Sequence, residues 1–333
     1  KRRKNRDSTR RPDAITFFII EGLADLGKEK MVLFVILLLG YMIILGGNSM
    51  IIFALTDSKL KSPMYFFLYN LSFVDIIYTT STIPTMLSGL LAGMKTISVL
   101  GCFLQMHVFI QLAVTGRAIL TVMAYDRYVA ICNPLRYTSI MTKSARVLLV
   151  AGAWSFGTLC TLPATSVAFQ RSYCGPNLVK HGWCDPSSVR RLVCGDVTVD
   201  NIISLSCAMV ALLVTGVFIL TSYILIGVSI LRMGVVQRLK AFRTCAAHLT
   251  VVSISYSSAS CVYISYRSSL NSLNQGSQTQ FRLLYAALTP FLNPMIYSLK
   301  NKELRESIGR TLMRLRPAVV LPTKDVNTVT KLS

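Results

Sequence analysis

The sequence predicts an all-α membrane protein, a seven-transmembrane helix bundle followed by a short amphipathic C-terminal interfacial helix. Three observations lead to this fold class. Hydrophobic residues make up 53% of the 333 residues and charged residues only 15%, against about 25% charged residues in ordinary soluble domains. Seven stretches reach the roughly 20 apolar residues that a bilayer-spanning helix needs, and short basic segments separate several of them. This composition excludes a disordered chain, a nucleic-acid-binding domain and an ordinary cytosolic enzyme.

The placement of the basic residues decides between two kinds of partner. The net charge is +21, and a strongly basic chain can bind nucleic acid. Here the Lys and Arg residues lie between the apolar stretches and in both tails, as the cationic flanks of membrane spans do. We therefore expect a lipid bilayer around the chain and no nucleic-acid partner.

The connections between the spans predict their orientation. Those at 57–62, 133–145 and 233–241 are short and basic, and basic loops stay in the cytoplasm. The long connection at 170–198 and the N-terminus are then extracellular, and the C-terminus is cytoplasmic, as in a multi-pass plasma-membrane protein. Residues 1–11, with seven basic residues, conflict with this rule. The predicted spans are 31–56, 63–91, 100–132, 146–169, 199–232, 242–266 and 280–299.

The segments outside the spans complete the predicted organisation. The segment that follows the last span has an apolar face and a basic face, which is typical of a helix lying in the inner membrane interface. Its apolar face consists of Leu304, Ile308, Leu312 and Leu315. The predicted parts are an extracellular segment 1–30, a transmembrane domain 31–299, an interfacial helix 300–316 and a disordered cytoplasmic tail 317–333.

Four of the nine cysteines fall on the predicted outer side: Cys102, Cys174, Cys184 and Cys194. An even number of cysteines in an oxidising compartment indicates two disulfides. Three pairings are possible, and the sequence alone does not separate them. A zinc site is not expected, because the long loop has no C-x-x-C and only one histidine, His181.

Polar residues inside the spans are costly and are therefore candidates for function. Asn48, Asp75 and Asn293 fall in the first, second and last spans. They could form one hydrogen-bonded cluster that holds water or a cation. The alternative is a purely structural network.

The end of the third span and the last span carry two further motifs. Arg127, in Asp126-Arg127-Tyr128, lies about 37 Å along a helix from Cys102, and so at the inner rim. There it could hold a neighbouring helix through a breakable ion pair; the alternative is simple interfacial snorkelling. Pro294 should kink the last helix, as a moving part or as a static bend.

Taken together, these motifs resemble those of rhodopsin-like G-protein-coupled receptors. The shared features are Gly47-Asn48, Asp75, Asp126-Arg127-Tyr128, Trp154 and Asn293-Pro294-x-x-Tyr297. Longer strings narrow the resemblance to the vertebrate olfactory receptor family, over about residues 15–316. They are PMYFFL at 63–68, MAYDRYVAIC at 123–132, KAFRTC at 240–245 and PFLNPMIYSLKN at 290–301.

The resemblance implies a function, partners and a disulfide pairing. Family members bind a small odorant in the outer half of the bundle and activate a stimulatory, olfactory-type heterotrimeric G protein, which raises cyclic AMP. The family pattern pairs Cys102 with Cys184, which leaves Cys174 with Cys194. A rhodopsin-like receptor of the same fold for a non-odorant small molecule is the alternative.

The family geometry also implies a pocket between the third, fifth, sixth and seventh helices. Helical spacing then selects the side chains that face it, and they are mostly apolar with a few hydroxyls. They are Met106, Phe109, Ile110, Ala113, Val114, Ser204, Cys207, Ala208, Ala211, Tyr256, Ala259, Ser260, Tyr263, Thr279 and Leu283.

The switch residues follow from the same resemblance. Arg127 would take the G-protein switch role, and Tyr223 and Tyr297 would meet near it in the active state. Basic residues that follow the fifth helix would contact the G protein. The full set is Asp126, Arg127, Tyr128, Tyr223, Arg238, Lys240, Arg243, Asn293, Pro294 and Tyr297.

One position departs from the family pattern. Family members usually carry an acidic residue in the middle of the third helix, level with Asp75, where this chain has Gly116 followed by Arg117. We hypothesise that Arg117 replaces the cation and pairs with Asp75. In the alternative, Arg117 reaches backbone carbonyls or water.

Other function classes lack their motifs. The sequence has no G-x-S-x-G, no H-E-x-x-H and only three histidines, so no enzyme, catalytic residue, metal or cofactor is expected. A transporter would show transport-linked charges or repeated broken helices, and neither is present.

Overall fold

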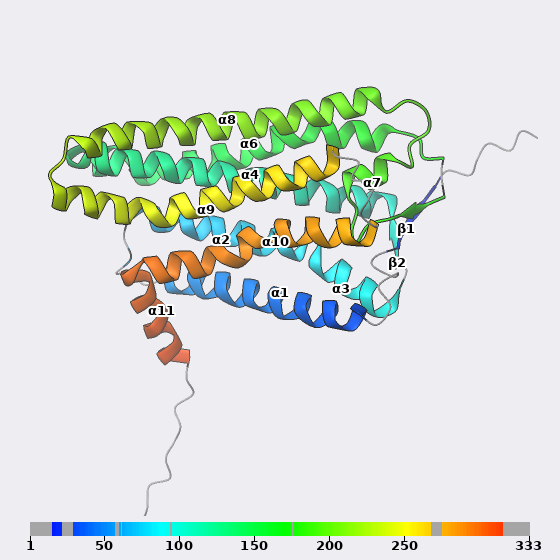
Figure 1. The fold of residues 1–333 in the computed structure, drawn as a ribbon, viewed down its shortest axis with the longest axis horizontal. Helices are drawn as coiled ribbons and strands as arrows, with labels where there is room; N and C mark the ends of the chain where they lie inside the picture. The colour runs from blue at the N-terminus through cyan, green and yellow to red at the C-terminus, as the bar shows by residue number, and fades with distance from the viewer. Residues whose placement is uncertain are drawn as a thin grey trace, which may run out of the picture.

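The computed structural model describes residues 15–21, 29–56, 60, 62–93, 95–174, 176–267 and 275–315. Long helices run side by side in it and form a bundle (Figure 1). The basic segment 1–11 and the predicted disordered tail 317–333 lie outside the described residues.

Eight long helices account for the seven predicted spans, because the second span consists of two helices. Each long helix begins or ends within a few residues of its predicted boundary, except at the start of the sixth span. The helices are α1 (Glu29–Ala54), α2 (Pro63–Thr80), α3 (Ile83–Ala92), α4 (Val99–Cys132), α6 (Lys143–Gln170), α8 (Thr198–Leu231), α9 (Val235–Arg267) and α10 (Gln275–Lys300). Shorter elements are η2 (Pro134–Arg136), α5 (Tyr137–Ile140), α7 (Pro186–Arg190) and α11 (Lys302–Leu315).

The break between α2 and α3 has a local cause. Pro84 has no N–H group and cannot continue the hydrogen-bond ladder of α2, so a new helix starts at Ile83. The hydroxyl of Ser81 donates to the carbonyl of Tyr78 at 2.7 Å and occupies an acceptor in the last turn of α2.

Four helices are long and apolar enough over their described residues to cross a membrane by themselves: α1, α4, α6 and α8. The other long helices are too short or too polar, for reasons that can be seen in their sequences. The second span is divided, α9 begins with basic residues and has a serine-rich middle, and α10 contains two prolines. Polar residues in such helices are tolerated because neighbouring helices satisfy them.

The connection predicted at 233–241 is shorter than expected. Helix α8 ends at Leu231 and α9 begins at Val235, so Arg238, Lys240 and Arg243 lie on a helix rather than in a loop. Residues 235–241 contain no Gly or Pro after Gly234, and Leu, Arg, Lys and Gln extend a helix at little cost.

Close approaches between helices fix the bundle. A Cβ on Gly157 of α6 would collide with the side chain of Thr115 on α4, and a Cβ on Gly47 of α1 would lie 2.9 Å from Cβ of Pro294 on α10. Small residues at such positions let membrane helices pack backbone to backbone.

A C-terminal helix, α11, is present where the interfacial helix is predicted. Leu304 is fully buried in the main core, and the hydroxyl of Ser307 donates to the carbonyl of Ala54 at 3.0 Å. Helix α11 leaves the line of the bundle at an angle (Figure 1). The first turns of its apolar face are therefore fixed against the bundle, whereas Leu312 is exposed.

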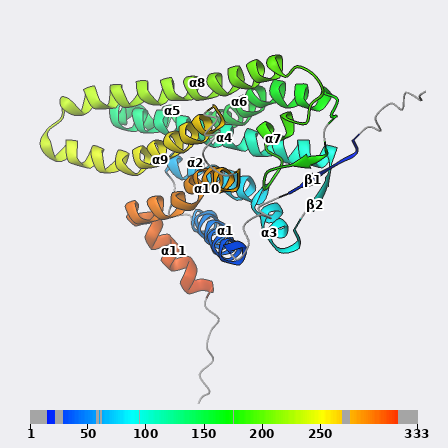
Figure 2. The ribbon, with the colours of Figure 1, turned by 45° about the vertical axis from the view of Figure 1, so that its right-hand side comes forward.

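A small sheet closes one end of the bundle. Strand β1 (Phe17–Ile20) pairs antiparallel with β2 (Lys95–Ser98) and parallel with β3 (Leu178–Val179). The sheet lies at the same end as α7 (Figure 2). We call this the disulfide end, because Cys102–Cys184 and Cys174–Cys194 are bonded there; the opposite end is the Arg127 end.

Candidate ligand cavity and switch site

A cavity of about 860 Å³ extends from the disulfide end into the middle of the bundle. Helices α4, α6 and α8 contribute most of its wall, together with the loop that follows α6, and α2, α9 and α10 complete it. Volumes of this size suit small organic ligands. The expected pocket residues that line it are Met106, Phe109, Ile110, Ala113, Val114, Ser204, Cys207, Ala208, Ala211 and Ala259.

Two expected pocket residues do not line the cavity. Tyr256 of α9 donates a hydrogen bond from its phenol to Oγ1 of Thr215 on α8, at 2.7 Å, so this hydroxyl is used between two helices. Ser260 is exposed, since it lies on the outer face of α9. The side chains of Tyr263, Thr279 and Leu283 lie outside the described residues.

The sequence reasoning missed one wall and the mouth of the cavity. On α6, five residues line it: Cys160, Thr161, Ala164, Thr165 and Ala168. Their spacing of three and four residues marks one helix face, and this signal was present in the sequence. From the loop come Tyr173, Trp183, Pro186, Val189 and Arg190.

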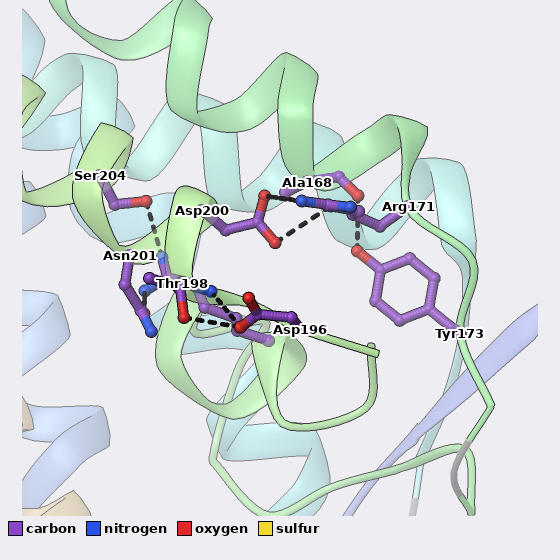
Figure 3. Close-up of polar contacts among 9 residues, drawn as sticks. Ala168, Arg171, Tyr173, Asp196, Thr198, Asp200, Asn201 and Ser204 are labelled. Carbon is purple, nitrogen blue, oxygen red and sulfur yellow. Dashed lines mark hydrogen bonds and ion pairs between the residues drawn. The ribbon is translucent and has the colours of Figure 1, made fainter. Parts of the chain in front are cut away.

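Charged residues at the mouth of the cavity are paired (Figure 3). Arg171 at the end of α6 donates to both carboxylate oxygens of Asp200 on α8, at 3.0 to 3.1 Å. Arg190 of α7 donates to Asn201 Oδ1 at 2.6 Å and to Ser204 Oγ at 2.7 Å. The mouth is therefore polar, and Arg171 and Arg190 have acceptors there, while Arg191 is a further cation of its wall.

Two groups beside the mouth have shifted pKa values. Hydrogen bonds from the hydroxyl and the N–H of Thr198 lower the pKa of the exposed Asp196 below its usual range. Burial raises the pKa of Tyr173, whose phenol donates to the carbonyl of Ala168 at 2.6 Å. Both contacts appear in Figure 3 and hold the loop against α6 and α8.

The two disulfides have the pairing that the family resemblance implies. Cys102–Cys184 ties the first turn of α4 to the loop, with 5.4 Å between Cα atoms. Cys174–Cys194 closes the loop on itself, with 5.2 Å between Cα atoms. Phe18 and Ile20 of β1 are buried against the first pair, so the loop forms a fixed roof over the cavity.

The polar residues of the spans do not form one connected cluster. Asn293 donates from Nδ2 to Asp75 Oδ2 at 2.7 Å, as the cluster prediction requires. Asn48 instead donates to the carbonyls of Ile44 and Pro290, at 3.0 and 3.3 Å. No ion pair joins Arg117 to Asp75 among the described residues, which contradicts the pairing hypothesis, although both residues line the cavity.

At the Arg127 end, Arg127 is held by its neighbour in sequence. Its Nε and Nη2 donate to Asp126 Oδ2 at 3.2 and 2.5 Å, and both residues are buried. Tyr137 of α5 donates to the other carboxylate oxygen at 2.8 Å. The ring of Tyr128 lies beside that of Tyr125. Arg127 is thus bound within its own helix rather than to another one.

Neither of the two tyrosines expected to meet near Arg127 is hydrogen-bonded to it. Tyr223 forms a 2.6 Å hydrogen bond with His248 Nδ1, and His248 Nε2 lies 3.0 Å from the carbonyl of Leu120. Because a carbonyl only accepts, Nε2 carries the proton and Tyr223 donates to Nδ1. Tyr297 is buried, and its hydroxyl has no partner among the described residues. The sequence alone did not predict this contact between His248 and Tyr223.

The basic residues expected to contact a G protein are accessible. Arg238, Lys240 and Arg243 are all exposed on the first turns of α9. Arg238 also donates to the carbonyls of Leu231 and Met233, at 3.2 and 3.3 Å. These contacts join the start of α9 to the end of α8.

Comparisons with known proteins identify the family. The family model described as olfactory receptor matches residues 37–315. Human olfactory receptor 13D1 is 42% identical over 92% of this chain and 88% of its own length, and mouse olfactory receptor 6E1 is 40% identical over 88% of this chain and 93% of its own. Squid rhodopsin has the same fold, with a TM-score of 0.68 at 17% identity, and the match covers 87% of this chain and 80% of that one. The predicted seven-helix membrane fold is therefore confirmed, and the chain belongs to the olfactory receptor family.

Proposed function

We propose that this receptor binds a small odorant in the cavity and activates a stimulatory, olfactory-type G protein, which raises cyclic AMP. One observation carries the proposal. Helix α4 lines the cavity with Met106, Phe109 and Val114 and carries Arg127 at its other end. A ligand that changes the packing around α4 can therefore change the contacts of Arg127.

The orientation in the membrane is part of this proposal. Disulfides persist on the extracellular side of a membrane, which supports the disulfide end as the outer one. Basic residues favour the cytoplasmic side, and Arg238, Lys240 and Arg243 lie at the opposite end. The odorant then enters from outside, and the G protein binds at the Arg127 end.

Activation would be a shift between two populations of the receptor. The ligand must bind more tightly to the active state than to the inactive state, since equal affinity shifts nothing. The contacts of Arg127 with Asp126, and of Tyr223 with His248, would have to break before the two tyrosines could approach Arg127. These contacts belong to the inactive state in this scheme.

A cyclic AMP reporter assay tests the proposal. Cells that display the receptor at their surface would be exposed to a panel of volatile and water-soluble odorants, with Arg127→Ala as the control. A response that disappears in Arg127→Ala supports the proposal. Silence at verified surface display, or a response that Arg127→Ala leaves intact, contradicts it and favours a non-odorant ligand or a different G protein.

A further inference from the structure

Arg117 of α4 lies about 22 Å farther along the helix than Cys102, and it lines the deep part of the cavity. Its Nε is buried and has no hydrogen-bond partner among the described residues. Its side chain is half-buried and forms part of the cavity wall. Nothing in the described part of the chain forms an ion pair with it.

This situation is unusual for a charged group. A buried charge costs several kcal/mol unless an opposite charge or hydrogen bonds compensate it. The cavity wall has two described carboxylates, Asp75 and Asp200, and both are engaged. Asp75 accepts from Asn293 at 2.7 Å, and Asp200 forms the ion pair with Arg171. The guanidinium of Arg117 therefore lacks an anion that the described chain could supply.

The surroundings of Arg117 fit a ligand with a charged head and an apolar body. Ser258 also lines the cavity, and its buried hydroxyl has no partner among the described residues. Between Arg117 and the polar mouth the wall is apolar, with Phe109, Ala113 and Ala208. The cavity thus combines two polar donors without described partners with an apolar stretch of wall.

We propose that the ligand is a small carboxylic acid, bound as its carboxylate to the guanidinium of Arg117 with its apolar chain directed toward the disulfide end. This assignment rests on the proposed function and specifies its ligand class. A carboxylate matches the planar fork of N–H groups in arginine and accepts two parallel hydrogen bonds. A neutral ligand of the same shape leaves the charge uncompensated.

Thermal stability of the purified receptor in nanodiscs tests the ligand class without signalling. A ligand that binds only the folded state raises Tm. The probes are butanoate, hexanoate and octanoate, each compared with the alcohol and the methyl ester of the same chain, at constant chloride. We expect the acids to raise Tm at concentrations at which the neutral partners do not.

Three variants link such binding to Arg117. Arg117→Met keeps an unbranched, flexible side chain but removes its charge and its donors, and the acids should lose at least about ten-fold in affinity. Gly116→Glu offers an internal carboxylate beside Arg117, where an added Cβ meets only Val74 Cγ1 at 3.6 Å, and it should also suppress acid binding. Lys95→Met removes an exposed positive charge from β2 and should leave acid binding unchanged.

The outcomes separate this proposal from the proposed function. Alcohols or esters that raise both Tm and cyclic AMP while acids do nothing would overturn the acid assignment and leave the odorant receptor function intact. Stabilisation by acids that persists in Arg117→Met also overturns it, as does stabilisation by chloride alone. Acid binding that depends on Arg117 but raises no cyclic AMP supports the acid assignment and contradicts the proposed coupling. A purified receptor that no probe stabilises overturns the acid assignment.

Discussion

The two ends of the bundle are held together by different kinds of bond. At the disulfide end, two disulfides and a three-stranded sheet fix the loop over the cavity. At the Arg127 end, the described side-chain contacts include an ion pair and hydrogen bonds formed by Arg127, Tyr137, Tyr223 and His248. The first set persists through a conformational change, and the second can be exchanged.

The energies of these bonds support different roles for the two ends of the bundle. Removing a native disulfide from a small secreted domain costs about 2–5 kcal/mol, whereas one hydrogen bond contributes roughly 0.5–1.5 kcal/mol net. A few hydrogen bonds can therefore be broken by a ligand of modest affinity, while the cavity keeps its shape. This difference supports the proposal that the Arg127 end is the part that rearranges on activation.

The largest expected effect follows from removing the covalent link at the disulfide end. In the double variant Cys102→Ser, Cys184→Ser, the loop should separate from α4, and surface display should fall to a small fraction of the normal level. Flow cytometry of an N-terminal epitope tag measures this. Cys132→Ser changes a free cysteine in α4 and should be displayed normally; equal display of both variants would refute the assigned role of the disulfide.

A large effect is also expected from Asp126→Asn at the Arg127 end. Breaking a buried ion pair from one side costs about 3–5 kcal/mol, because it leaves a charge uncompensated. Because the guanidinium of Arg127 would then be free to bind other acceptors, the active state should be more populated. Basal cyclic AMP should rise several-fold per displayed receptor. Asp196→Asn changes an exposed carboxylate at the disulfide end and should leave basal cyclic AMP unchanged. Unchanged basal signalling in Asp126→Asn would contradict a restraining role for the ion pair.

His248→Phe should have a smaller effect in the same direction. Phenylalanine keeps the ring but loses the hydrogen bonds to Tyr223 and to the carbonyl of Leu120. Two hydrogen bonds of about 1 kcal/mol each predict a moderate rise in basal cyclic AMP, below that of Asp126→Asn. Ser222→Ala removes a half-buried hydroxyl next to Tyr223 that donates only to the carbonyl of Phe218 in its own helix, and it is the matched control. A fall in basal signalling would place these bonds in the active state instead.

The parts of the site that follow helical spacing could be predicted from the sequence. Met106, Phe109 and Ala113 line the cavity, because residues three and four apart share a helix face. Tyr256 was expected to line the cavity but does not. Helical spacing predicts which face of a helix a residue lies on, but not which neighbouring residue hydrogen-bonds to its hydroxyl. The tyrosine finds Thr215 on α8, and only the packing of α8 against α9 brings these two together.

The contacts that depend on chain pairing over long distances could not be predicted. Phe17–Ile20 becomes a strand only because residues 95–98 and 178–179 come to lie beside it. No local pattern in four apolar residues specifies such partners. The pairing of Arg171 with Asp200 is a consequence of how the loop returns to α8, and the state of Arg117 emerges only when every nearby carboxylate has been assigned.

The smallest expected effect concerns the ion pair at the mouth of the cavity. The Arg171 side chain is 34% exposed and that of Asp200 is 6% exposed, so solvent screens one partner and the pair should contribute only about 0.2–1 kcal/mol. A double-mutant cycle with Arg171→Gln and Asp200→Asn, followed by thermal unfolding in nanodiscs, measures this coupling. Because exposed pairs weaken at high salt, the coupling should decrease between low and high sodium chloride. A coupling that is larger than that of Asp126 with Arg127 and independent of salt would reverse the comparison, since the strongest charged contact would then lie beside the disulfides rather than at the moving end.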